Sequence, residues 1–324
     1  MASHSLGVSD SAVLSYANAR RSLAPIPVSE QGLATAVAEP YFQVSEDALG
    51  LEGPAYDREG NLLFVDVFGG RVLRLSTDRQ LDTVYTDKAL HPAGLAIHKD
   101  GRVFVACVGD FRTGCVIAID ANGSNVRTIV PPSAGYVPDD LVFDANGGFY
   151  FTDFRGASTD PAGGVYYVPP SLDAIKPVLP RMCAANGVAL SPDGKVLWAT
   201  EYSAGRLHRV DMQDAITPVH FGTSVPYHFV GRAPDSMRCD ADGNVYVAMF
   251  HQGRVLAFSP YGVPIGQILL PGREDNHFLK SASLAFVPGL RDIVIVARDE
   301  LGGHGSMIFR AKALAPGVTL FSHQ

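Results

Sequence analysis

Short apolar runs alternate with polar turns along most of the chain. The same order recurs six times: an apolar run, a turn that contains glycine, and a second apolar run rich in β-branched residues. Asp-Gly and Asn-Gly between such runs are strong signals of β-hairpins, because these turns require positive φ. The pattern therefore predicts six hairpins, at residues 54–67, 95–107, 141–153, 188–200, 237–249 and 284–297.

The glycines of these turns give the period of the repeat. They are separated by 41–49 residues and stand at Gly60, Gly101, Gly147, Gly194, Gly243 and Gly289. A third apolar run that opens with small residues follows each hairpin, and weaker fourth runs such as 82–86 and 266–270 follow in turn. Four short strands per unit, six times over about residues 50–322, predict an all-β fold, a six-bladed β-propeller with four-stranded antiparallel blades. A pair of β-sandwiches is the alternative, and it would match the period only by coincidence.

The residues before the first repeat suggest how the ring closes. Residues 34–44 form one more apolar run, which we expect to add an outer strand to the last blade. We expect residues 1–33 to be a loosely ordered N-terminal arm, followed by a single catalytic propeller domain over residues 34–324. The chain has one tryptophan, Trp198, so it lacks the WD-type propeller signature.

Composition narrows the classes of function. Hydrophobic residues make up 47% of the chain, which excludes a disordered protein, and no apolar stretch approaches the roughly 18 residues of a membrane span. A net charge of −7 without a basic cluster argues against binding nucleic acid or an acidic membrane. Residues 1–27 contain no apolar signal-peptide core, and no two cysteines form a Cys-x-x-Cys pair. We therefore expect a cytoplasmic protein with reduced thiols at Cys107, Cys115, Cys183 and Cys239.

The glycine register selects candidate site residues at the mouth of the ring. In a propeller the first strand of each blade lines the central channel, and eight positions before each turn glycine stand Glu52, Ala93, Asp139, Asn186, Asp235 and Ser281. Three carboxylates, an amide and a hydroxyl would converge there, and such a group is costly to bury unless a cation neutralises it. An all-oxygen set without His or Cys favours Ca²⁺ over Zn²⁺. Asp and Asn at the start of a strand can also simply cap a turn. A metal site is favoured only because these residues would all lie at one level of the channel.

The second strand of each hairpin returns to the same rim. Near its end stand Asp66, Cys107, Asp153, Glu201, His251 and Asp299. Aromatic residues beside them are candidate apolar walls of a small-molecule pocket: Phe68, Phe154, Tyr202 and Phe250. Asp153, His251 and His304 are further pocket candidates, because imidazoles can move protons near neutral pH. A structural hydrogen bond or a solvated loop position is the alternative for each of these three.

Four segments carry a resemblance to a known family. Residues 51–57 (LEGPAYD), 137–156 (VPDDLVFDANGGFYFTDFRG), 185–201 (ANGVALSPDGKVLWATE) and 233–248 (APDSMRCDADGNVYVA) resemble the gluconolactonase/regucalcin (senescence marker protein) family of six-bladed propellers. The similarity covers about residues 35–324, and residues 264–273 (PIGQILLPGR) resemble the calcium-dependent cytoplasmic bacterial lactonases of that family. The resemblance implies a Ca²⁺ ion held by Glu52, Asp139, Asn186 and Asp235, with Ser236 as an additional ligand.

The resemblance also implies roles for these residues. Asp235 would be the acid/base residue, and Asp139 a metal ligand that assists it, while the ion polarises the carbonyl of a lactone. A second, structural Ca²⁺ site would use a loop near 112–115 and the segment 131–136, where this chain has Pro131 and Ala134 instead of an acidic and a hydroxyl residue. Thr113, Gly114 and Tyr136 are what remains of that site.

Three functions stay open at this point. The first is a calcium-dependent lactonase, a hydrolase of carboxylic ester bonds (EC 3.1.1-type) acting on small lactones. The others are an organophosphate or aryl ester hydrolase with the same site, and a non-catalytic calcium-binding propeller. Other divalent ions could replace Ca²⁺. We expect a small lactone as the only partner, neither nucleic acid nor membrane, and a monomer or weak dimer.

Overall fold

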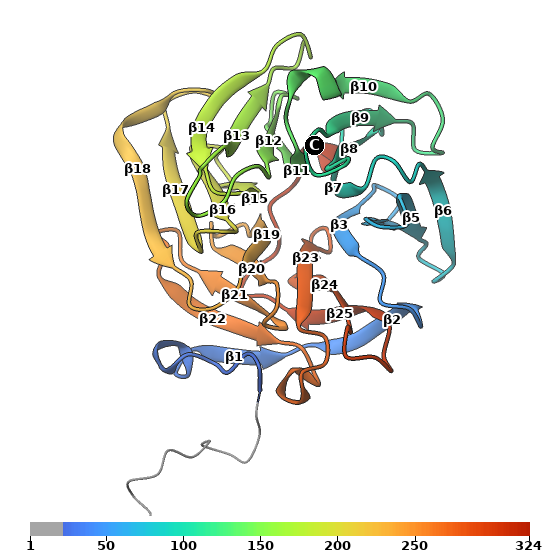
Figure 1. Ribbon diagram of the computed structural model, residues 1–324, viewed down its shortest axis with the longest axis vertical. Coiled ribbons are helices and arrows are strands. Elements are labelled where there is room, and N and C mark those ends of the chain that lie inside the picture. The colour runs from blue at the N-terminus through green and yellow to red at the C-terminus, as the bar shows by residue number, and fades with distance from the viewer. Residues whose placement is uncertain (1–21) are drawn as a thin grey trace, which may run out of the picture.

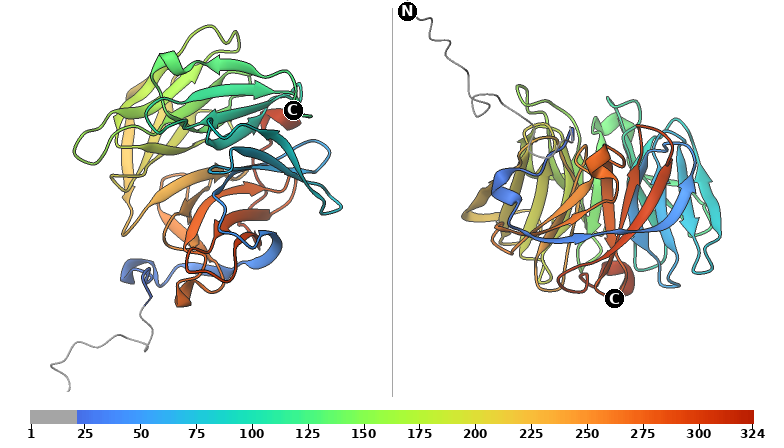
Figure 2. Two further views of the ribbon diagram at one scale, coloured as in Figure 1. Left: turned by 45° about the vertical axis from the view of Figure 1, so that its right-hand side comes forward. Right: turned by 90° about the horizontal axis from the view of Figure 1, so that it is seen from below.

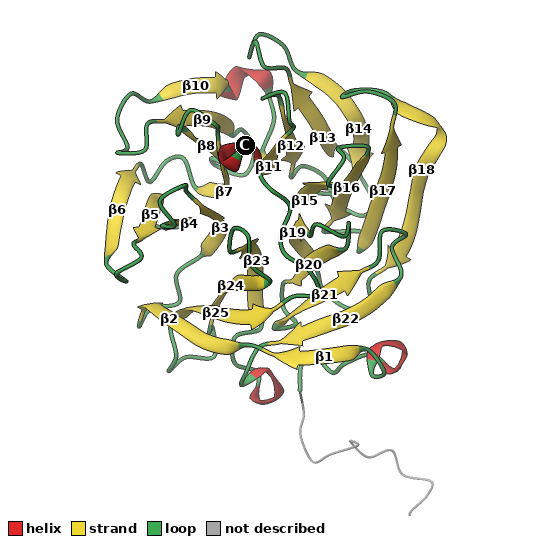
Figure 3. Ribbon diagram, turned by 180° about the vertical axis from the view of Figure 1, so that it is seen from behind, coloured by secondary structure: helices red, strands yellow, loops and turns green. Residues whose placement is uncertain are grey.

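Six small sheets form a ring around a central channel in the computed structural model, which describes residues 22–324 (Figures 1 and 3). In each sheet the first strand of the predicted hairpin is innermost, and it contacts the corresponding strands of the two neighbouring sheets. This arrangement confirms the predicted six-bladed β-propeller.

The first three blades follow the chain without interruption. Blade 1 contains β3 (Leu51–Tyr56), β4 (Leu62–Asp66), β5 (Arg71–Leu75) and β6 (Leu81–Thr86). Blade 2 contains β7 (Pro92–Ile97), β8 (Val103–Cys107), β9 (Cys115–Ile119) and β10 (Arg127–Val130). Blade 3 contains β11 (Pro138–Phe143), β12 (Phe149–Asp153), β13 (Gly163–Val168) and β14 (Lys176–Met182).

The other three blades include both ends of the propeller. Blade 4 contains β15 (Ala185–Leu190), β16 (Val196–Glu201), β17 (Arg206–Met212) and β18 (Pro218–His228). Blade 5 contains β19 (Pro234–Cys239), β20 (Val245–Met249), β21 (Arg254–Phe258), β22 (Pro264–Leu269) and β1 (Ala34–Val37). Blade 6 contains β23 (Lys280–Phe286), β24 (Asp292–Arg298), β25 (Ser306–Lys312) and β2 (Glu39–Ser45). Short 3-10 turns lie at Val28–Glu30, Pro132–Ala134, Arg273–Asp275 and Phe321–His323.

One N-terminal segment joins the last two blades. As expected for residues 34–44, β2 pairs antiparallel with β25 and completes blade 6. In addition, β1 pairs parallel with β22 and gives blade 5 a fifth strand, which the repeat pattern did not indicate. The segment runs along the side of the ring (Figure 2, right). Of the expected N-terminal arm, residues 1–21 lie outside the described residues, whereas Glu30 is buried and pairs with Arg254 at 2.5 Å.

The core lies between the blades. Each pair of neighbouring blades encloses one apolar cluster, so the second strands are apolar on both faces and β4, β8, β12 and β20 are buried throughout. This explains why the hairpins show continuous apolar runs rather than strict alternation. Trp198 is buried in the cluster between blades 4 and 5.

The C-terminal residues cover the far end of the channel. Gly317 bridges to Asp240, and Phe321 packs against His98 and Phe143 on the face that carries the hairpin turns. Arg58 Nε donates a hydrogen bond to the Ser322 carbonyl at 2.6 Å. All four cysteines are buried and unlinked. Within residues 22–324, none of the helices has the length and apolar character that crossing a bilayer requires.

Candidate metal centre and substrate pocket

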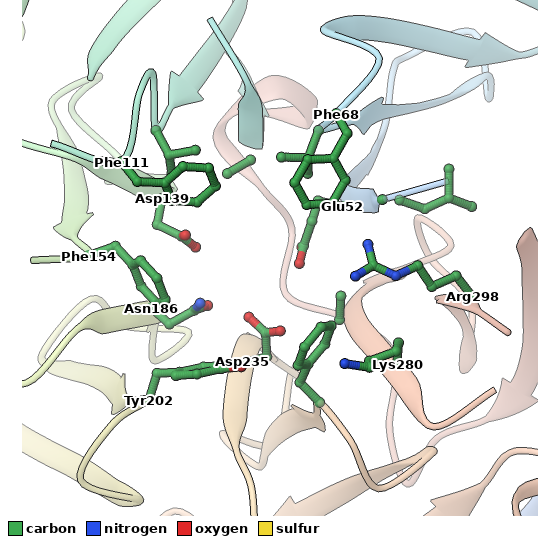
Figure 4. A pocket seen from close by; sticks show the side chains of 17 residues that line it. Glu52, Phe68, Phe111, Asp139, Phe154, Asn186, Tyr202, Asp235, Lys280 and Arg298 are labelled. Atoms are coloured by element: carbon green, nitrogen blue, oxygen red, sulfur yellow. The ribbon is translucent and has the colours of Figure 1, made fainter. Parts of the chain in front are cut away.

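Four of the five oxygen-bearing residues of the predicted ring line one cavity at the open mouth of the channel (Figure 4). Each stands on the first strand of its blade, at a β-bulge where pairing with the second strand is interrupted. A bulge redirects the side chains it contains, and here it points them toward the channel axis. The carboxylates and the amide point toward a common centre in Figure 4, from Glu52, Asp139, Asn186 and Asp235. Ala93 lines the same cavity from blade 2.

Blade 6 departs from the register that the turn glycines predicted. Ala282 lines the cavity there, not Ser281, which is fully buried and donates a hydrogen bond to the Met249 carbonyl at 2.9 Å. The prediction was wrong because Gly289 stands three residues after Phe286, the last paired residue of its strand, whereas Gly60 stands four residues after Tyr56, the counterpart of Phe286 in blade 1. Counting back eight positions from Gly289 therefore goes one residue too far.

Burial and mutual repulsion disturb the acidity of the carboxylates in the cavity. Burial, reinforced by the charge of Asp140, raises the pKa of Asp139 to about 8. Burial also raises the pKa values of Glu52 and Asp235 well above their usual range, and the neighbouring acidic groups add to both shifts. A hydrogen bond from the Asn186 side chain acts in the opposite direction on Asp235. The three acids thus lie in an environment that opposes their charges.

The donor set fits a hard divalent cation. Among residues 22–324, no Lys, Arg or His forms an ion pair with Glu52, Asp139 or Asp235. The Oδ1 atom of Asn186 is buried and has no hydrogen-bond partner. A bound cation would satisfy that orphaned oxygen and neutralise the carboxylates, and oxygen-only ligands are those that Ca²⁺ prefers.

Ser236 adjoins this set without lining the cavity. It is buried, and its backbone N–H donates a hydrogen bond to the carboxylate of Asp235, which lowers the pKa of that group against the larger effect of burial. Its neighbour Asp235 is therefore oriented from both sides, by this N–H and by the amide of Asn186.

Two threonines that sequence reasoning missed hold the backbone of the site. Thr152 Oγ1 on β12 donates to the Asn186 carbonyl at 2.5 Å. Thr200 Oγ1 on β16 donates to the Asp235 carbonyl at 2.7 Å and accepts a hydrogen bond from Gly187 N. A side chain at position 187 would clash, because its Cβ would lie 2.6 Å from the Asp235 carbonyl oxygen. Each threonine precedes the acidic residue at the end of its strand, in FTD and ATE, and this repeated position is the signal that could have identified them.

A buried ion pair lies beneath the cavity. Asp140 accepts a hydrogen bond from Arg238 Nη1 at 2.8 Å and others from the backbone N–H groups of Leu141 and Val188. The charge of Asp140 is thus neutralised by Arg238, whereas the adjacent Asp139 has no such partner among the described residues. Sequence reasoning missed Arg238, because nothing in its surroundings marks it as facing the channel.

The predicted aromatic residues form the walls of the cavity. Phe68, Phe154, Tyr202 and Phe250 all line it, and the Phe154 and Tyr202 rings meet edge-on with centroids 5.4 Å apart. Phe111 adds a further apolar surface.

Two cations complete the cavity on the side of blade 6. Lys280 and Arg298 line it, and no sequence motif marks either residue. Both are held by Glu300, with Lys280 Nζ at 3.1 Å and Arg298 Nη2 at 2.8 Å from its carboxylate. Phe250 lies under the Lys280 ammonium at 4.7 Å. The pocket therefore has an acidic centre, an aromatic wall and a cationic wall.

Three other pocket candidates lie outside the cavity lining. Asp153 is fully buried within blade 3, where it accepts a hydrogen bond from Val137 N and pairs with Arg155. His251 stands behind Lys280 at 3.2 Å, and burial, with the Lys280 charge, lowers its pKa to about 4. His304 packs against His277 on the loop before β25.

The residues that the resemblance implied for a second calcium site contact one another or their neighbours. Gly114 N donates a hydrogen bond to the Tyr136 carbonyl at 2.7 Å, and the Tyr136 ring packs against Phe151. Thr113 hydrogen-bonds to Asp110 through both its backbone N–H and its hydroxyl. The loops at 112–115 and 131–136 are therefore adjacent, as a shared site would require.

Fold and site together define a class of protein: six-bladed propellers with an oxygen-rich acidic cluster at the mouth of the channel. The chain belongs to the SMP-30/Gluconolactonase/LRE-like region family, whose model matches residues 51–280. It is 48% identical to Lactonase drp35 of Staphylococcus saprophyticus over 310 residues, 94% of this chain and 96% of the relative. It is 45% identical to Lactonase drp35 of Staphylococcus aureus over 321 residues, 97% of this chain and 98% of the relative.

Solved structures show the same fold at lower sequence identity. Regucalcin from Agrobacterium tumefaciens, described as a calcium-binding protein, superposes with a TM-score of 0.71 at 18% identity, covering 88% of this chain and 98% of that one. A gluconolactonase from Xanthomonas campestris gives a TM-score of 0.67 at 20% identity, covering 90% of this chain and all of that one.

Proposed function

We propose that this protein is a calcium-dependent lactonase that hydrolyses the ester bond of small lactones at the mouth of the propeller. The observation that carries the proposal is the convergence of three unpaired carboxylates and the orphaned Asn186 oxygen in one cavity with aromatic walls. The names of the curated relatives, lactonases aligned over nearly their full lengths, support this activity rather than simple calcium storage.

The four residues of the channel would hold the ion: Glu52, Asp139, Asn186 and Asp235. A divalent cation bound there supplies positive charge that polarises an ester carbonyl and stabilises the negative charge developing on it. The bulged strands fix the ligands before the ion binds, and Thr152 and Thr200 hold the backbone of Asn186 and Asp235. Such preorganisation spares the site the free energy of rearranging during the reaction.

Asp235 is the proposed acid/base residue. Its carboxylate removes a proton from the attacking water and returns it to the leaving alkoxide, so that the ring oxygen departs as a hydroxyl group. The Asn186 amide and the Ser236 N–H orient the carboxylate for this exchange. Asp139 is a ligand that assists it, and its charge helps to keep Asp235 basic.

The walls suggest how a lactone would lie. Phe154, Tyr202 and Phe250 offer a flat apolar surface to the ring, while Lys280 and Arg298 stand on the cationic wall beside Phe250. Hydrolysis turns a neutral ester into a hydroxy acid, so these cations would also hold the carboxylate of the product. The four buried, unlinked thiols support the cytoplasmic location expected from the sequence.

The test compares four substrates before and after metal removal. Dihydrocoumarin, an aldonolactone, phenyl acetate and a phosphotriester are offered to protein treated with EDTA and to the same protein after Ca²⁺ is restored. We expect lactone hydrolysis to disappear with EDTA and to return with Ca²⁺, and lactones to be hydrolysed faster than the phosphotriester. Full turnover by metal-free protein, or an anomalous-scattering map of calcium-soaked crystals without an ion at Asp235, would overturn the proposal.

A further inference from the structure

A second cluster of metal-binding side chains lies on blade 6, outside the channel. It consists of His277 in the loop before β23, Asp299 directly after β24, and His304 in the loop before β25. One ligand atom from each residue lies within 4.8 Å of the others. From this geometry we infer a separate binding site for a transition-metal ion of the zinc class, formed by His277, Asp299 and His304. The inference does not depend on the proposed lactonase activity.

The positions of the three side chains are close to those that a bound ion needs. Nδ1 of His277 lies 2.9 Å from Oδ2 of Asp299, and the two imidazole rings meet edge-on with centroids 4.6 Å apart. Zinc–nitrogen bonds are about 2.0–2.1 Å, so ligand atoms on opposite sides of an ion are at most about 4.2 Å apart. Only a small movement of His304, the exposed member, would close the set.

Other contacts orient the ligands. Asp299 is 1% exposed, and its second oxygen accepts a hydrogen bond from Leu301 N at 3.1 Å. The ring of Phe278 packs on His304 with centroids 5.5 Å apart, and Phe278 in turn packs on Phe309 in the core. The exposed imidazole is therefore held beside its partner rather than free in solvent.

Comparison with the other blades shows what is particular to this cluster. The acidic residue that ends the second strand pairs with an arginine in blades 1 and 3, as Asp66 does with Arg71 and Asp153 with Arg155. An arginine cannot ligate a metal ion, because it stays protonated. In blade 4 an imidazole, His208, contacts Glu201, but only at Asp299 do two imidazoles among the described residues join the carboxylate.

The chemistry of the ligands selects the class of ion. Two imidazoles and a carboxylate are a ligand set for Zn²⁺ and similar ions, whereas Ca²⁺ prefers oxygen ligands alone. The two sites should therefore bind different metals. An ion here would also fasten the loop 299–305, whose Glu300 holds Lys280 and Arg298 at the cavity.

The test is a titration of calcium-saturated protein, freed of any polyhistidine tag, with Co²⁺ as a spectroscopic substitute for Zn²⁺. Saturating Ca²⁺ occupies the oxygen site, so binding there does not interfere. We expect one equivalent of Co²⁺ to give the visible absorption of a nitrogen-ligated ion, and Zn²⁺ to displace it. Hydrogen exchange should show that Zn²⁺ protects the amides of 299–305.

Matched variants locate the ion. His304→Ala and His277→Ala should each lower the affinity at least tenfold, while His220→Ala, an exposed histidine on β18, should leave it unchanged. His304 lies on an exposed loop, so its replacement should not prevent folding. Equal Co²⁺ binding by the wild type and both cluster variants, or no binding by the wild type, would refute the site and leave the proposed lactonase activity untouched.

Discussion

Two sets of carboxylates stand at the same rim of the ring and have opposite environments. The channel carboxylates, Glu52, Asp139 and Asp235, have no cationic partner among the described residues, and burial raises the pKa of each. The blade carboxylates, Asp66, Asp153 and Glu201, end the second strands and are each paired with an arginine of their own blade. Burial alone would raise the pKa of Glu201, but hydrogen bonds from His208 and from Cys183 N lower it to about 2.

The contrast separates charges that serve the fold from charges that serve a ligand. A buried charge is tolerated only when something neutralises it. The blade carboxylates bring that partner from a neighbouring position in the same sheet, so the folded chain is complete without help. The channel carboxylates leave the countercharge to be supplied from solution. The comparison predicts that the two sets respond differently to the same kind of substitution.

The largest effect is expected at the channel. Asp235→Asn keeps the shape of the side chain and removes the group that exchanges protons, so kcat on a lactone should fall by about 10²–10⁴-fold. Because the substitution also relieves repulsion, the melting temperature of the metal-free protein should stay equal or rise. Steady-state kinetics and calorimetry on the same preparation give both values. A variant that loses stability but keeps its kcat would contradict the assignment of Asp235.

The matching substitution among the blade carboxylates should lower stability and leave kcat nearly unchanged. Glu201→Gln removes a buried charge that accepts hydrogen bonds from His208 and from Cys183 N. Hydrogen bonds to charged groups contribute about 1.5–3 kcal/mol each, so we expect the free energy of unfolding to fall by about 2 kcal/mol. Urea denaturation measures this loss, and kcat at a permissive temperature should change less than threefold. A large loss of kcat without destabilisation would place Glu201 among the functional carboxylates.

The two sets of carboxylates also predict opposite dependences of the free energy of unfolding on pH. The pKa of Glu201 is about 2 in the folded protein and lies below its unfolded value, so its stabilisation is present above about pH 4.5 and disappears as the pH falls. The pKa of Asp139 is about 8 and lies above its unfolded value, so metal-free protein should lose stability as the pH rises from about 4 to 8. Each titrating carboxylate changes the slope of the free energy of unfolding against pH by at most about 1.4 kcal/mol per pH unit.

Urea denaturation in EDTA at several pH values tests these slopes. Ca²⁺ should flatten the slope between about pH 6 and 8, where it competes with protons for the channel carboxylates. The Glu201→Gln variant is the control for the acid range, where the difference from wild type should vanish. A metal-free protein whose stability increases toward pH 8 would contradict the environment described for Asp139.

The smallest effect is expected for the hydroxyl of Thr200, which links β15 to β19. Thr200→Val leaves the Asp235 carbonyl and Gly187 N without their partner, which should lower stability by about 1–2 kcal/mol and displace the ligands slightly. We expect the affinity for Ca²⁺ and kcat/KM to fall by about tenfold, and Thr200→Ser to restore both. Unchanged Ca²⁺ affinity in the valine variant would show that this hydroxyl does not position the site.

Much of the fold and the centre of the site follow from local sequence signals. The hairpin glycines report on turns a few residues long, and five of the six residues counted from them line the cavity. Ser281 does not, because the glycine of that turn stands one position nearer to the first strand of its hairpin than Gly60 does in blade 1. The aromatic walls were predictable for the same reason as the ring, since they directly follow strands of known direction.

The remaining features depend on contacts between distant segments. Arg238 and Asp140 are 98 residues apart, and no local pattern pairs them. The parallel strand β1 docks on β22, more than 200 residues later in the chain, because blade 5 leaves an open edge there. Whether an acidic residue at a strand end faces the channel or the blade likewise depends on which cation a neighbouring strand presents, as Asp153 and Arg155 show.

The N-terminal segment that spans blades 5 and 6 also has a consequence for the order of synthesis. Strand β2 can pair only after β25 has been made, and β1 only after β22, so residues 34–45 must wait until nearly the whole chain has been translated. Pairings of such long sequence separation form slowly and leave strand edges open in the meantime. The newly made protein therefore passes through a period as an open ring, in which the edges of β22 and β25 are unpaired. During this period chaperones or a second unfinished copy can bind these edges.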